Sequence, residues 1–484
     1  MPQEHRHLKN SRARSDYSIL HAPCDTERMS IRRFLPPGGT AADAMAAGHA
    51  LRSESPLKDH AHLNLPQQRD ILAVIEGTHR QRIPELVGVR VNRMRQSAYA
   101  YYRGTAEMMA ADLSHSARSG IRTVISGDAH LGNFGLYASP ERRLVFDLND
   151  FDEAGIGPWE WDVKRLLTSF VLELREQGAS ASEIHDELVE VASAYRLMLD
   201  ALVFMDATDR YFASVEAGDL IATGHRSFFK SVNKARRRTS EQSLGKIAER
   251  DEDGRLRLAL QPPLLIPYPD ERKEHMNYRF QEYLRTLLSD RALLLSQYRI
   301  VDVARRVVGV SSVGTHCSVV LLQGPQGEPL VLQIKESLRS VLTSHGGLEG
   351  VIPKGAEHDA RHCYRVTESQ RILQSASDPF LGRTVDVDGR NFFWRQFRDM
   401  KGSFNLKSAG RSEVRAYATL CARQLARAHA QSPDSAAIAG YTKNASEFDH
   451  ALSHWAKAYA DVIEQDYGVF MEAVEEGRLP VTDG

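Results

Sequence analysis

Apolar residues recur at helical spacing over most of the chain. This spacing of three and four residues predicts amphipathic helices. The predicted helices begin near Arg69 and lie at Met94–Leu113, from Trp161 to about Met205, from Arg272 to Tyr298 and in the last part of the chain, where Ala416–Ala430 is the clearest. The chain is therefore expected to be mainly helical.

Two regions have strand patterns instead. The first is a short apolar strand at Ile121–Ile125, followed by a hairpin whose strands lie around Phe134–Tyr137 and Leu144–Phe146. The second region starts at Val301, where apolar runs alternate with Gly-containing turns. Its predicted strands are Val307–Val310, Ser318–Leu322, Leu330–Ile334 and Asn391–Phe397, with a helix at roughly Asp359–Ser375.

These patterns predict an α+β protein in four segments. Residues 1–62 mix Arg, His, Ser, Pro and Gly without periodicity, which predicts a poorly ordered tail. Residues 63–300 are predicted to form a helical lobe and residues 301–400 a β-rich lobe. Residues 401–484 are predicted to be helices that complete the helical lobe. A chain of 484 residues is long enough to bury two cores.

Composition narrows the class of protein. The net charge of −1 offers no general attraction to nucleic acid or to anionic membranes. The chain has no apolar run that could span a bilayer and no secretion signal, so we expect a cytoplasmic protein. Its four cysteines are far apart, which favours neither zinc nor disulfides. The basic run Phe228–Ser240 is interpreted as a solvated helix face, and the oligomeric state stays open.

A Gly-rich loop, Ser126–Gly135, contains the first candidate residues. Asp128 and Asn133 stand five positions apart on a loop that leaves a strand. In phosphoryl transfer such an Asp accepts the proton of the attacking hydroxyl, and such an Asn binds a divalent cation. Asp and Asn are also common turn formers, and an isolated pair at this spacing would favour that structural role.

A second acidic segment follows the hairpin. Asp147, Asp150 and Asp152 lie within six residues, and their charges repel one another unless a cation lies among them. Oxygen ligands of this kind prefer Mg²⁺ or Mn²⁺. We therefore predict a metal site built from Asn133, Asp150 and Asp152.

These residues resemble known motifs. Gly127–Asn133 resembles the catalytic loop of aminoglycoside phosphotransferases and their protein-kinase-like relatives, and Asn149–Gly155 resembles their metal-binding segment. About 90–470 is similar to the bacterial family named domain of unknown function 2252. The resemblance implies that Asp128 is the catalytic base, that Asn133 and Asp150 hold the metal with help from Asp152, and that Asp162 braces the catalytic loop. Ser126 departs from the phosphotransferase pattern, which often has His there.

The nucleotide-binding residues of such an enzyme are predicted after the catalytic loop rather than before it. Gly309 and Gly314 bound a loop between two strands, and Lys335 ends the next strand. Backbone N–H groups of such a loop can approach phosphate oxygens, and a Lys can neutralise their charge. Glu368 is the predicted partner of Lys335, with Glu357 as the alternative, and adenine is expected near Phe397 and Arg398. The order predicts a circularly permuted two-lobed kinase-like fold.

The predicted function is ATP-dependent transfer of a phosphoryl group, with Mg²⁺ or Mn²⁺, to a hydroxyl on an unidentified small-molecule or protein acceptor. Three alternatives stay open: a non-catalytic, pseudokinase-like nucleotide-binding protein, a metal-dependent phosphohydrolase using the same carboxylates, and a nucleotidyltransferase. A phosphohydrolase would not need the 301–400 lobe, and a nucleotidyltransferase would leave a different group on the product. Fold analogy does not identify the acceptor.

Overall fold

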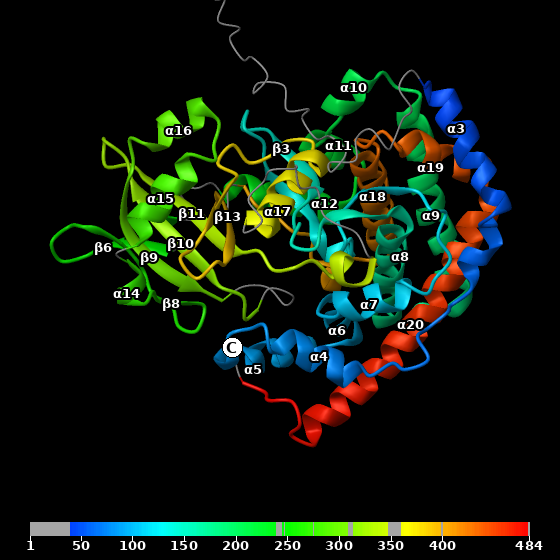
Figure 1. Ribbon diagram of the computed structural model, residues 1–484, viewed down its shortest axis with the longest axis horizontal. Helices are drawn as coiled ribbons and strands as arrows, with labels where there is room; N and C mark the ends of the chain where they lie inside the picture. The colour runs from blue at the N-terminus through cyan, green and yellow to red at the C-terminus, as the bar shows by residue number, and fades with distance from the viewer. Residues whose placement is uncertain are drawn as a thin grey trace, which may run out of the picture.

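The computed structural model describes residues 39–238, 244–245, 247–273, 275–307, 313–346, 360–397 and 400–482. The chain is an α+β protein. Figure 1 shows a sheet with short helices on the left and a larger helical part on the right, with α17 (Arg361–Leu373) between them.

One antiparallel sheet organises the β-rich part. Its six strands lie in the order β12-β13-β11-β10-β9-β8. In chain order they are β8 (Leu265–Pro267), β9 (Arg299–Arg306), β10 (Cys317–Gln323), β11 (Pro329–Glu336), β12 (Gly382–Val385) and β13 (Asn391–Gln396). Strands β9, β10 and β11 form a meander, and β13 pairs with the outer edge of β11 so that Lys335 lies opposite Phe393.

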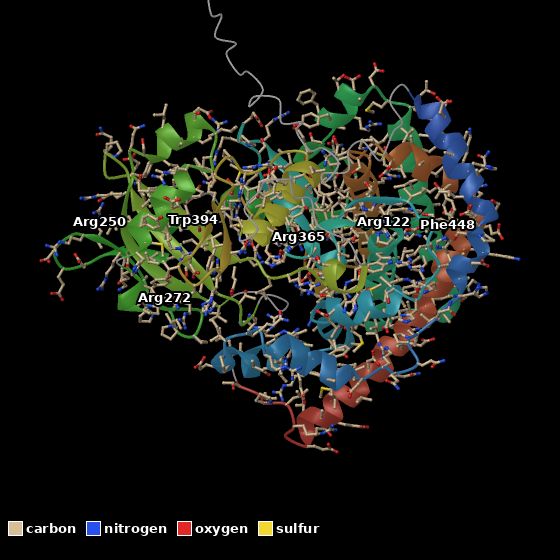
Figure 2. The ribbon with its side chains drawn as sticks, viewed as in Figure 1. Arg122, Arg250, Arg272, Arg365, Trp394 and Phe448 are labelled. Atoms are coloured by element: carbon tan, nitrogen blue, oxygen red, sulfur yellow. The ribbon has the colours of Figure 1, made fainter. Side chains whose placement is uncertain are left out.

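The two faces of this sheet differ because side chains alternate along a strand. Leu332 and Ile334 of β11 pack with Trp394 of β13 and with Tyr283 of α15 (Met276–Leu284). The stacked rings of Tyr283 and Trp394 are 4.6 Å apart, and Trp394 lies inside this part of the molecule (Figure 2). Lys335, the residue after Ile334, therefore lies on the opposite face.

The helical part is built around α8 (Trp159–Glu176). Every residue of α8 from Trp159 to Leu174 is buried. Helices α9 (Ala181–Val203), α18 (Arg411–His429) and α20 (Ser446–Glu475) pack against it. Phe448 of α20 lies at 5.5 Å from the Trp159 ring and marks this core in Figure 2. A helix buried on all sides must pair each of its charged residues with other groups of the protein.

Shorter elements complete the two parts. The short helices before the Gly-rich loop Ser126–Gly135 are α3 (Ala41–Ala50), η2 (Leu51–Ser53), η3 (Leu57–Ala61), α4 (Ile71–His79), α5 (Pro84–Met94), α6 (Ala98–Arg103) and α7 (Ala106–Leu113). η4 (Leu131–Asn133) lies within this loop. The short helices after it are α10 (Ala207–Phe212), α11 (Ala217–Ala222), α12 (Arg226–Arg237), α14 (Asp270–Lys273), α16 (Ser289–Leu295), the π-helical turn η5 (Leu342–Gly346), η7 (Leu406–Ser408) and α19 (Ser435–Thr442).

Three small sheets position the loops of the site. β1 (Arg122–Ile125) pairs with β4 (Gly155–Pro158), and β2 (Phe134–Ala138) pairs with β3 (Leu144–Leu148) and β5 (Val215–Glu216) in a second sheet. The third contains β6 (Ala248–Arg250) and β7 (Leu256–Leu258). Because β1 precedes the Gly-rich loop and β4 follows the acidic segment, their pairing brings the two ends of the 126–154 region together.

Several predicted elements are confirmed. The hairpin has the expected strands and turn, with Leu136 opposite Phe146. The predicted strands at Ser318–Leu322, Leu330–Ile334 and Asn391–Phe397 correspond to β10, β11 and β13, and the predicted helix at Asp359–Ser375 corresponds to α17. The basic segment begins with α12, which buries Phe228, Val232 and Ala235 and exposes its cations, as expected of a solvated face.

Other predictions are wrong. The 1–62 tail is too long, because α3, η2 and η3 fall within it and α3 packs on α19. Met94–Leu113 is not one helix, since α6 starts at the N-cap Ser97 and ends at Gly104. Of the strand predicted at Val307–Val310, Val307 follows the end of β9 (Arg299–Arg306), and residues 308–310 lie outside the described residues.

The boundary between the predicted lobes also differs. Residues from about 265 to 300 were assigned to the helical lobe, but β8 pairs with β9 of the large sheet. The predicted helix Arg272–Tyr298 is divided into α14, α15 and α16, and α15 packs on that sheet through Phe280 and Tyr283. Apolar periodicity reports that a helix buries one face, and it does not report which core receives that face.

Candidate functional site

Asp128 lies on the loop between β1 and η4. Gly127 precedes it with a positive φ of 72°, and a β-carbon there would collide with the carbonyl oxygen of Glu153. Asp162 of α8 accepts hydrogen bonds from the backbone N–H groups of Ser126 (2.7 Å) and Gly127 (2.9 Å). These two hydrogen bonds hold the backbone directly before Asp128. Asp162 therefore braces this loop, as predicted.

A buried arginine holds the carboxylate of Asp128. Arg165 of α8 places Nε and Nη2 each 2.8 Å from Asp128 Oδ1, and its Nη2 also donates to the carbonyl of Tyr102. Burial raises the pKa of Asp128 to about 6, against the opposing charge of Arg165. A carboxyl group that titrates near neutral pH can both accept and release a proton under ordinary conditions.

Asn133 lies at the other end of the same loop and bonds to Asp128. Its side-chain nitrogen donates to the backbone carbonyl of Asp128 at 2.7 Å and lies 3.4 Å from Asp128 Oδ2. This use of the nitrogen leaves the amide oxygen of Asn133 as the atom that can face a ligand. Asn133 and Asp128 are both buried, so the two predicted residues form one unit.

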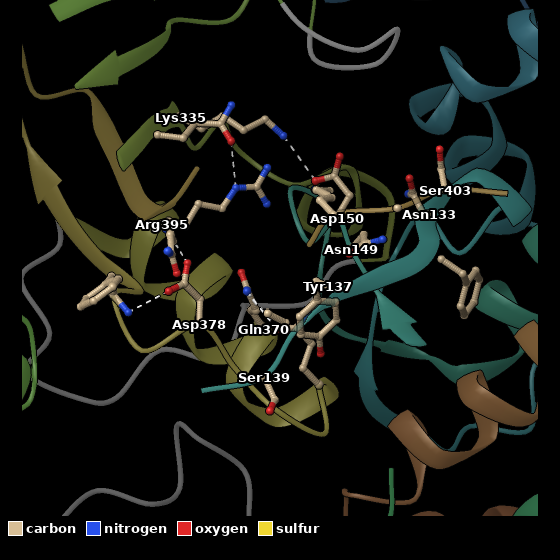
Figure 3. Close-up of a pocket in the computed structure, with 18 of the residues that line it drawn as sticks. Asn133, Tyr137, Ser139, Asn149, Asp150, Lys335, Gln370, Asp378, Arg395 and Ser403 are labelled. Carbon is tan, nitrogen blue, oxygen red and sulfur yellow. Dashed lines mark hydrogen bonds and ion pairs between the residues drawn. The ribbon is translucent and has the colours of Figure 1, made fainter. Parts of the chain in front are cut away.

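Lys335 meets the acidic segment. Its Nζ lies 3.3 Å from Oδ1 of Asp150 and is also hydrogen-bonded to Oδ2 of Asp152, although these partners are separated by 185 and 183 residues in the chain. Figure 3 shows Lys335 reaching from the sheet toward Asp150 on the hairpin side of the cavity. The acidic segment and the β-rich part therefore share one site.

The two aspartates differ in their pKa. Burial acts to raise the pKa of Asp150, but the charges of Lys335, Arg395 and Lys401 outweigh burial and lower it. The pKa of Asp152 is raised by burial and by the charge of Asp150, with Lys335 opposing. Asp150 is therefore the carboxylate that stays ionised most readily.

A cavity of about 640 Å³ opens beside Lys335 and Asp150. Figure 3 shows Asn133, Asn149, Asp150, Lys335 and Arg395 around it. Its charged lining comprises Asp150 and Asp378 against a larger set of cations, which is Arg103, Arg142, Arg238, Arg306, Arg395, Lys335 and Lys401. Such a surplus of positive charge favours an anionic ligand.

The pKa of Lys401 also reflects the surplus of positive charge in this cavity. Burial, together with the charge of Arg395, lowers the pKa of Lys401 to about 7. An anion that entered the cavity would favour the protonated form of this lysine and raise its pKa again. The cavity is therefore suited to take up negative charge.

Only some of the predicted site residues lie close together in the structure. Asp128, Asn133, Asp150, Asp152 and Lys335 come together. Glu368 does not join them, because its ion pairs are with Arg371 (2.6 Å) and Arg383 (3.7 Å). The predicted pairing of Lys335 with Glu368 is thus wrong, and Asp150 and Asp152 take that place.

The glycine loop is described only in part. Gly309, the alternative partner Glu357 and the adenine-side residue Arg398 lie outside the described residues. Gly314 has a φ of 92°, and its carbonyl accepts the backbone N–H of Ile83 at 2.7 Å. A β-carbon on Gly314 would lie 2.8 Å from the β-carbon of Arg82, so this end of the loop is packed against the α4–α5 connection.

Two arginines that hold the site were not predicted. Arg165 pairs with Asp128, and Arg365 of α17 donates to the backbone carbonyls of Asp152, Ala154 and Leu338. A signal existed for Arg165, because charged residues recur among the apolar residues of α8 and need partners when that helix is buried on all sides. The sequence has no comparable signal for Arg365, whose acceptors are backbone carbonyls.

Asp150 and Asn133 offer oxygen atoms of the kind that hard cations such as Mg²⁺ bind. Among the residues that the structure describes, no three His, Cys, Asp or Glu side chains form a metal-binding group. The carboxylate of Asp150 borders the cavity beside the amide of Asn133. Mg²⁺ commonly takes one or two protein carboxylates and completes its shell with phosphate oxygens and water, so Asp150 and Asn133 are the residues here that could hold it.

Comparisons with known proteins agree with one part of the predicted resemblance. Within the described part of the chain, no helix is both long and apolar enough to cross a bilayer. No curated protein and no solved structure matches the chain. A match is found over residues 82–473 to the family described as "Uncharacterized protein conserved in bacteria (DUF2252)". Because this match covers most of its length, the chain belongs to that bacterial family.

Proposed function

We propose that this protein is an ATP-dependent phosphotransferase that acts on a hydroxyl acceptor and has a circularly permuted, kinase-like arrangement. The observation that carries the proposal is the contact of Lys335 with Asp150, from two segments 185 residues apart. A phosphate-orienting lysine and a metal-binding aspartate must border the same nucleotide. Their meeting beside a cation-rich cavity is what this chemistry requires.

The order of elements in the β-rich part supports the proposal. A strand (β9), a loop containing Gly314, a second strand (β10) and a third strand (β11) that carries Lys335 follow one another, and then come α17 and two more strands. Kinases likewise place a Gly-rich loop over the phosphates and the lysine on the third strand of the lobe. Here the catalytic loop precedes these elements in the chain, as a permuted arrangement requires.

The proposed roles follow from the positions. Asp128 orients the acceptor hydroxyl and takes its proton, while Lys335 holds phosphate oxygens of ATP. Asp150 and Asn133, with Asp152 beside them, would hold Mg²⁺, which when bound supplies neutralisation of the phosphate charge. The protein contributes little covalent chemistry in such a reaction, so most of the rate gain comes from positioning the acceptor and the phosphate.

The raised pKa of Asp128 predicts a pH profile. The base form of a carboxyl group whose pKa is about 6 predominates above that pH, so turnover should fall about tenfold per pH unit below about pH 5.5 and level off above pH 7. Asp128→Asn should lower kcat by roughly a hundredfold to ten-thousandfold and remove this acidic limb. The measurement is ATP turnover and transfer of labelled phosphate across pH 4.5–8. Equal rates and profiles in the wild type and the variant would contradict the proposal.

One observation favours the non-catalytic alternative. Arg165 holds Asp128 Oδ1 through two nitrogens at 2.8 Å, and a permanently paired carboxylate is a weaker base. A nucleotide-binding regulatory protein with this site would bind ATP without Mg²⁺-dependent turnover. Calorimetric binding of ATP, measured on the same preparation as turnover, separates the two functions.

A further inference from the structure

A second, smaller cavity of about 80 Å³ borders the catalytic loop from the side of the N-terminal helices. Asp128, Asn133 and Asp150 line it together with residues of the segment from Thr78 to Glu107. Asp128 lines this cavity and does not line the larger one, whereas Lys335 and Arg395 line only the larger one. The proposed base therefore faces the smaller cavity, which adjoins the larger one at their shared lining residues Arg103, Asn133 and Asp150.

Four arginines line the smaller cavity. Arg339 is exposed and donates to the carbonyl of Thr343, and the other three are Arg82, Arg90 and Arg103. Arg90 is fully buried, and the other two are half-buried. The Nε atom of each is buried, and within the described part of the chain it has no hydrogen-bond partner. Buried polar atoms are nearly always bonded, so three such atoms around one small space need an explanation.

The hydrogen bonds of these arginines go to uncharged groups, although the charges of Glu153, Asp152 and Glu336 act on Arg82 without forming an ion pair with it. Arg82 donates to the carbonyl of Val313 at 2.6 Å, and Arg90 donates to the carbonyl of Gly104 and contacts the ring of His79. Among the described residues none of the three arginines forms an ion pair with a carboxylate. Burial and the nearby charges of Arg90 and Arg82 lower the pKa of His79 to about 3, as a positive local field would.

The carboxylates on the walls of the same cavity are already bonded elsewhere. Their partners are Arg165 for Asp128, Lys335 for Asp150 and Asp152, the backbone N–H of Val341 for Glu153, the backbone N–H of His316 for Glu336, and His345 for Glu107. Holding buried cations without a bonded anion is costly. An arginine group retained under these conditions indicates an anion that arrives with a ligand.

We propose that Arg82, Arg90 and Arg103 form an anion subsite that holds a phosphate or carboxylate group of the acceptor. The inference rests on the proposed function, because it places the acceptor hydroxyl at Asp128 and the anionic group beside it. Guanidinium groups bind phosphate and carboxylate oxygens through paired, charge-assisted hydrogen bonds. The acceptor is therefore a hydroxyl compound that already carries a negative charge, rather than a neutral sugar or a cationic drug.

The nucleotide does not account for this group. Its phosphates have Lys335, Arg395 and Lys401 in the larger cavity, and Arg103 is the member of the arginine group that borders both spaces. Arg103 lies next to Gly132, where its Nε would be 3.3 Å from an added β-carbon, and so stands beside the catalytic loop. It would connect the anionic group of the acceptor with the reacting centre.

The test uses the full-length protein without nucleotide and measures binding of inorganic phosphate, and in parallel of acetate, by titration calorimetry. Arg82→Gln and Arg103→Gln should each weaken the binding of the preferred anion at least tenfold. Arg250→Gln is the control, since Arg250 is exposed and lines neither cavity, and it should change this affinity less than twofold. Arg395→Gln reports any anion binding in the larger cavity. Thermal unfolding of each variant checks that it is folded. If one of the two variants, Arg82→Gln or Arg103→Gln, does not fold, the other still tests the subsite.

The outcomes are distinct. Tighter binding of phosphate identifies a phosphorylated acceptor, and tighter binding of acetate identifies a carboxylate acceptor. Undetectable binding of both anions, or binding that is weakened by Arg395→Gln and not by folded Arg82→Gln or Arg103→Gln, overturns the subsite. Anion binding that depends on Arg82 and Arg103 without any ATP turnover keeps the subsite and rejects the phosphotransferase function. ATP turnover in a protein whose anion binding does not depend on Arg82 and Arg103 keeps the phosphotransferase function and rejects the subsite.

Discussion

Replacing Asp150 with alanine is expected to lower Mg²⁺-dependent ATP turnover by at least about a thousandfold, which corresponds to roughly 4 kcal/mol of transition-state stabilisation. The variant removes the carboxylate that stays ionised most readily in the site and that contacts Lys335. It should remain folded, because Asp150 follows β3 and its side chain is 27% exposed. Turnover at saturating ATP, with Mg²⁺ varied, measures the effect.

Two further variants test whether the loss in Asp150→Ala is specific to this site. Asp209→Ala removes an exposed carboxylate far along the chain and should leave turnover unchanged. Lys335→Met should also lower turnover, and because Lys335 and Asp150 are in contact, the double variant should lose less than the two single losses combined. Wild-type rates in Asp150→Ala, or full additivity with Lys335→Met, would mean that the two residues do not serve one catalytic site.

Asp162→Ala is expected to cause the largest loss of stability, about 3–5 kcal/mol in the free energy of unfolding. The carboxylate of Asp162 is fully buried and accepts the backbone N–H groups of Ser126 and Gly127, and His429 lies 3.2 Å from its Oδ2. Alanine would leave these buried groups without an acceptor. Urea unfolding followed by tryptophan fluorescence measures the shift, since Trp159 lies in the same core.

The asparagine variant of the same position is the control. Asp162→Asn keeps one acceptor oxygen and nearly the same volume, so its loss of stability should be less than half that of Asp162→Ala. Turnover should fall in both variants, because the catalytic loop loses part of its support. Equal stability of Asp162→Ala and the wild type would show that the hydrogen bonds of Asp162 are not needed to hold this loop.

The sequence predicted the local parts of the site well. The hairpin, the loop with Asp128 and Asn133 and the acidic segment after β3 were recognised from turn residues and from charges close together in the chain. The same holds for β10, β11, α17 and β13. Each of these features depends on interactions between residues a few positions apart, and the order of residues reports such interactions directly.

Edges and short strands were not predicted. β4, β5, β8 and β12 have two to four residues, too few for an alternating pattern to show, and each forms by pairing with a strand distant in the chain or at a sheet edge. The helices at 272–298 were expected with the first lobe but lie on the large sheet. A face that is apolar enough to be buried fits more than one core, and the fold decides between them.

The sequence by itself determined which residues could do chemistry: Asp128 and Asn133 on one loop, Asp150 and Asp152 on the next, and Lys335 at the end of a strand. Only the tertiary structure decided their partners. Lys335 pairs with Asp150 and Asp152 rather than with Glu368, Asp128 pairs with Arg165, and Arg82, Arg90 and Arg103 line a cavity beside Asp128. The physical reason is that charge interactions depend on distance and burial, and neither can be read from separation along the chain.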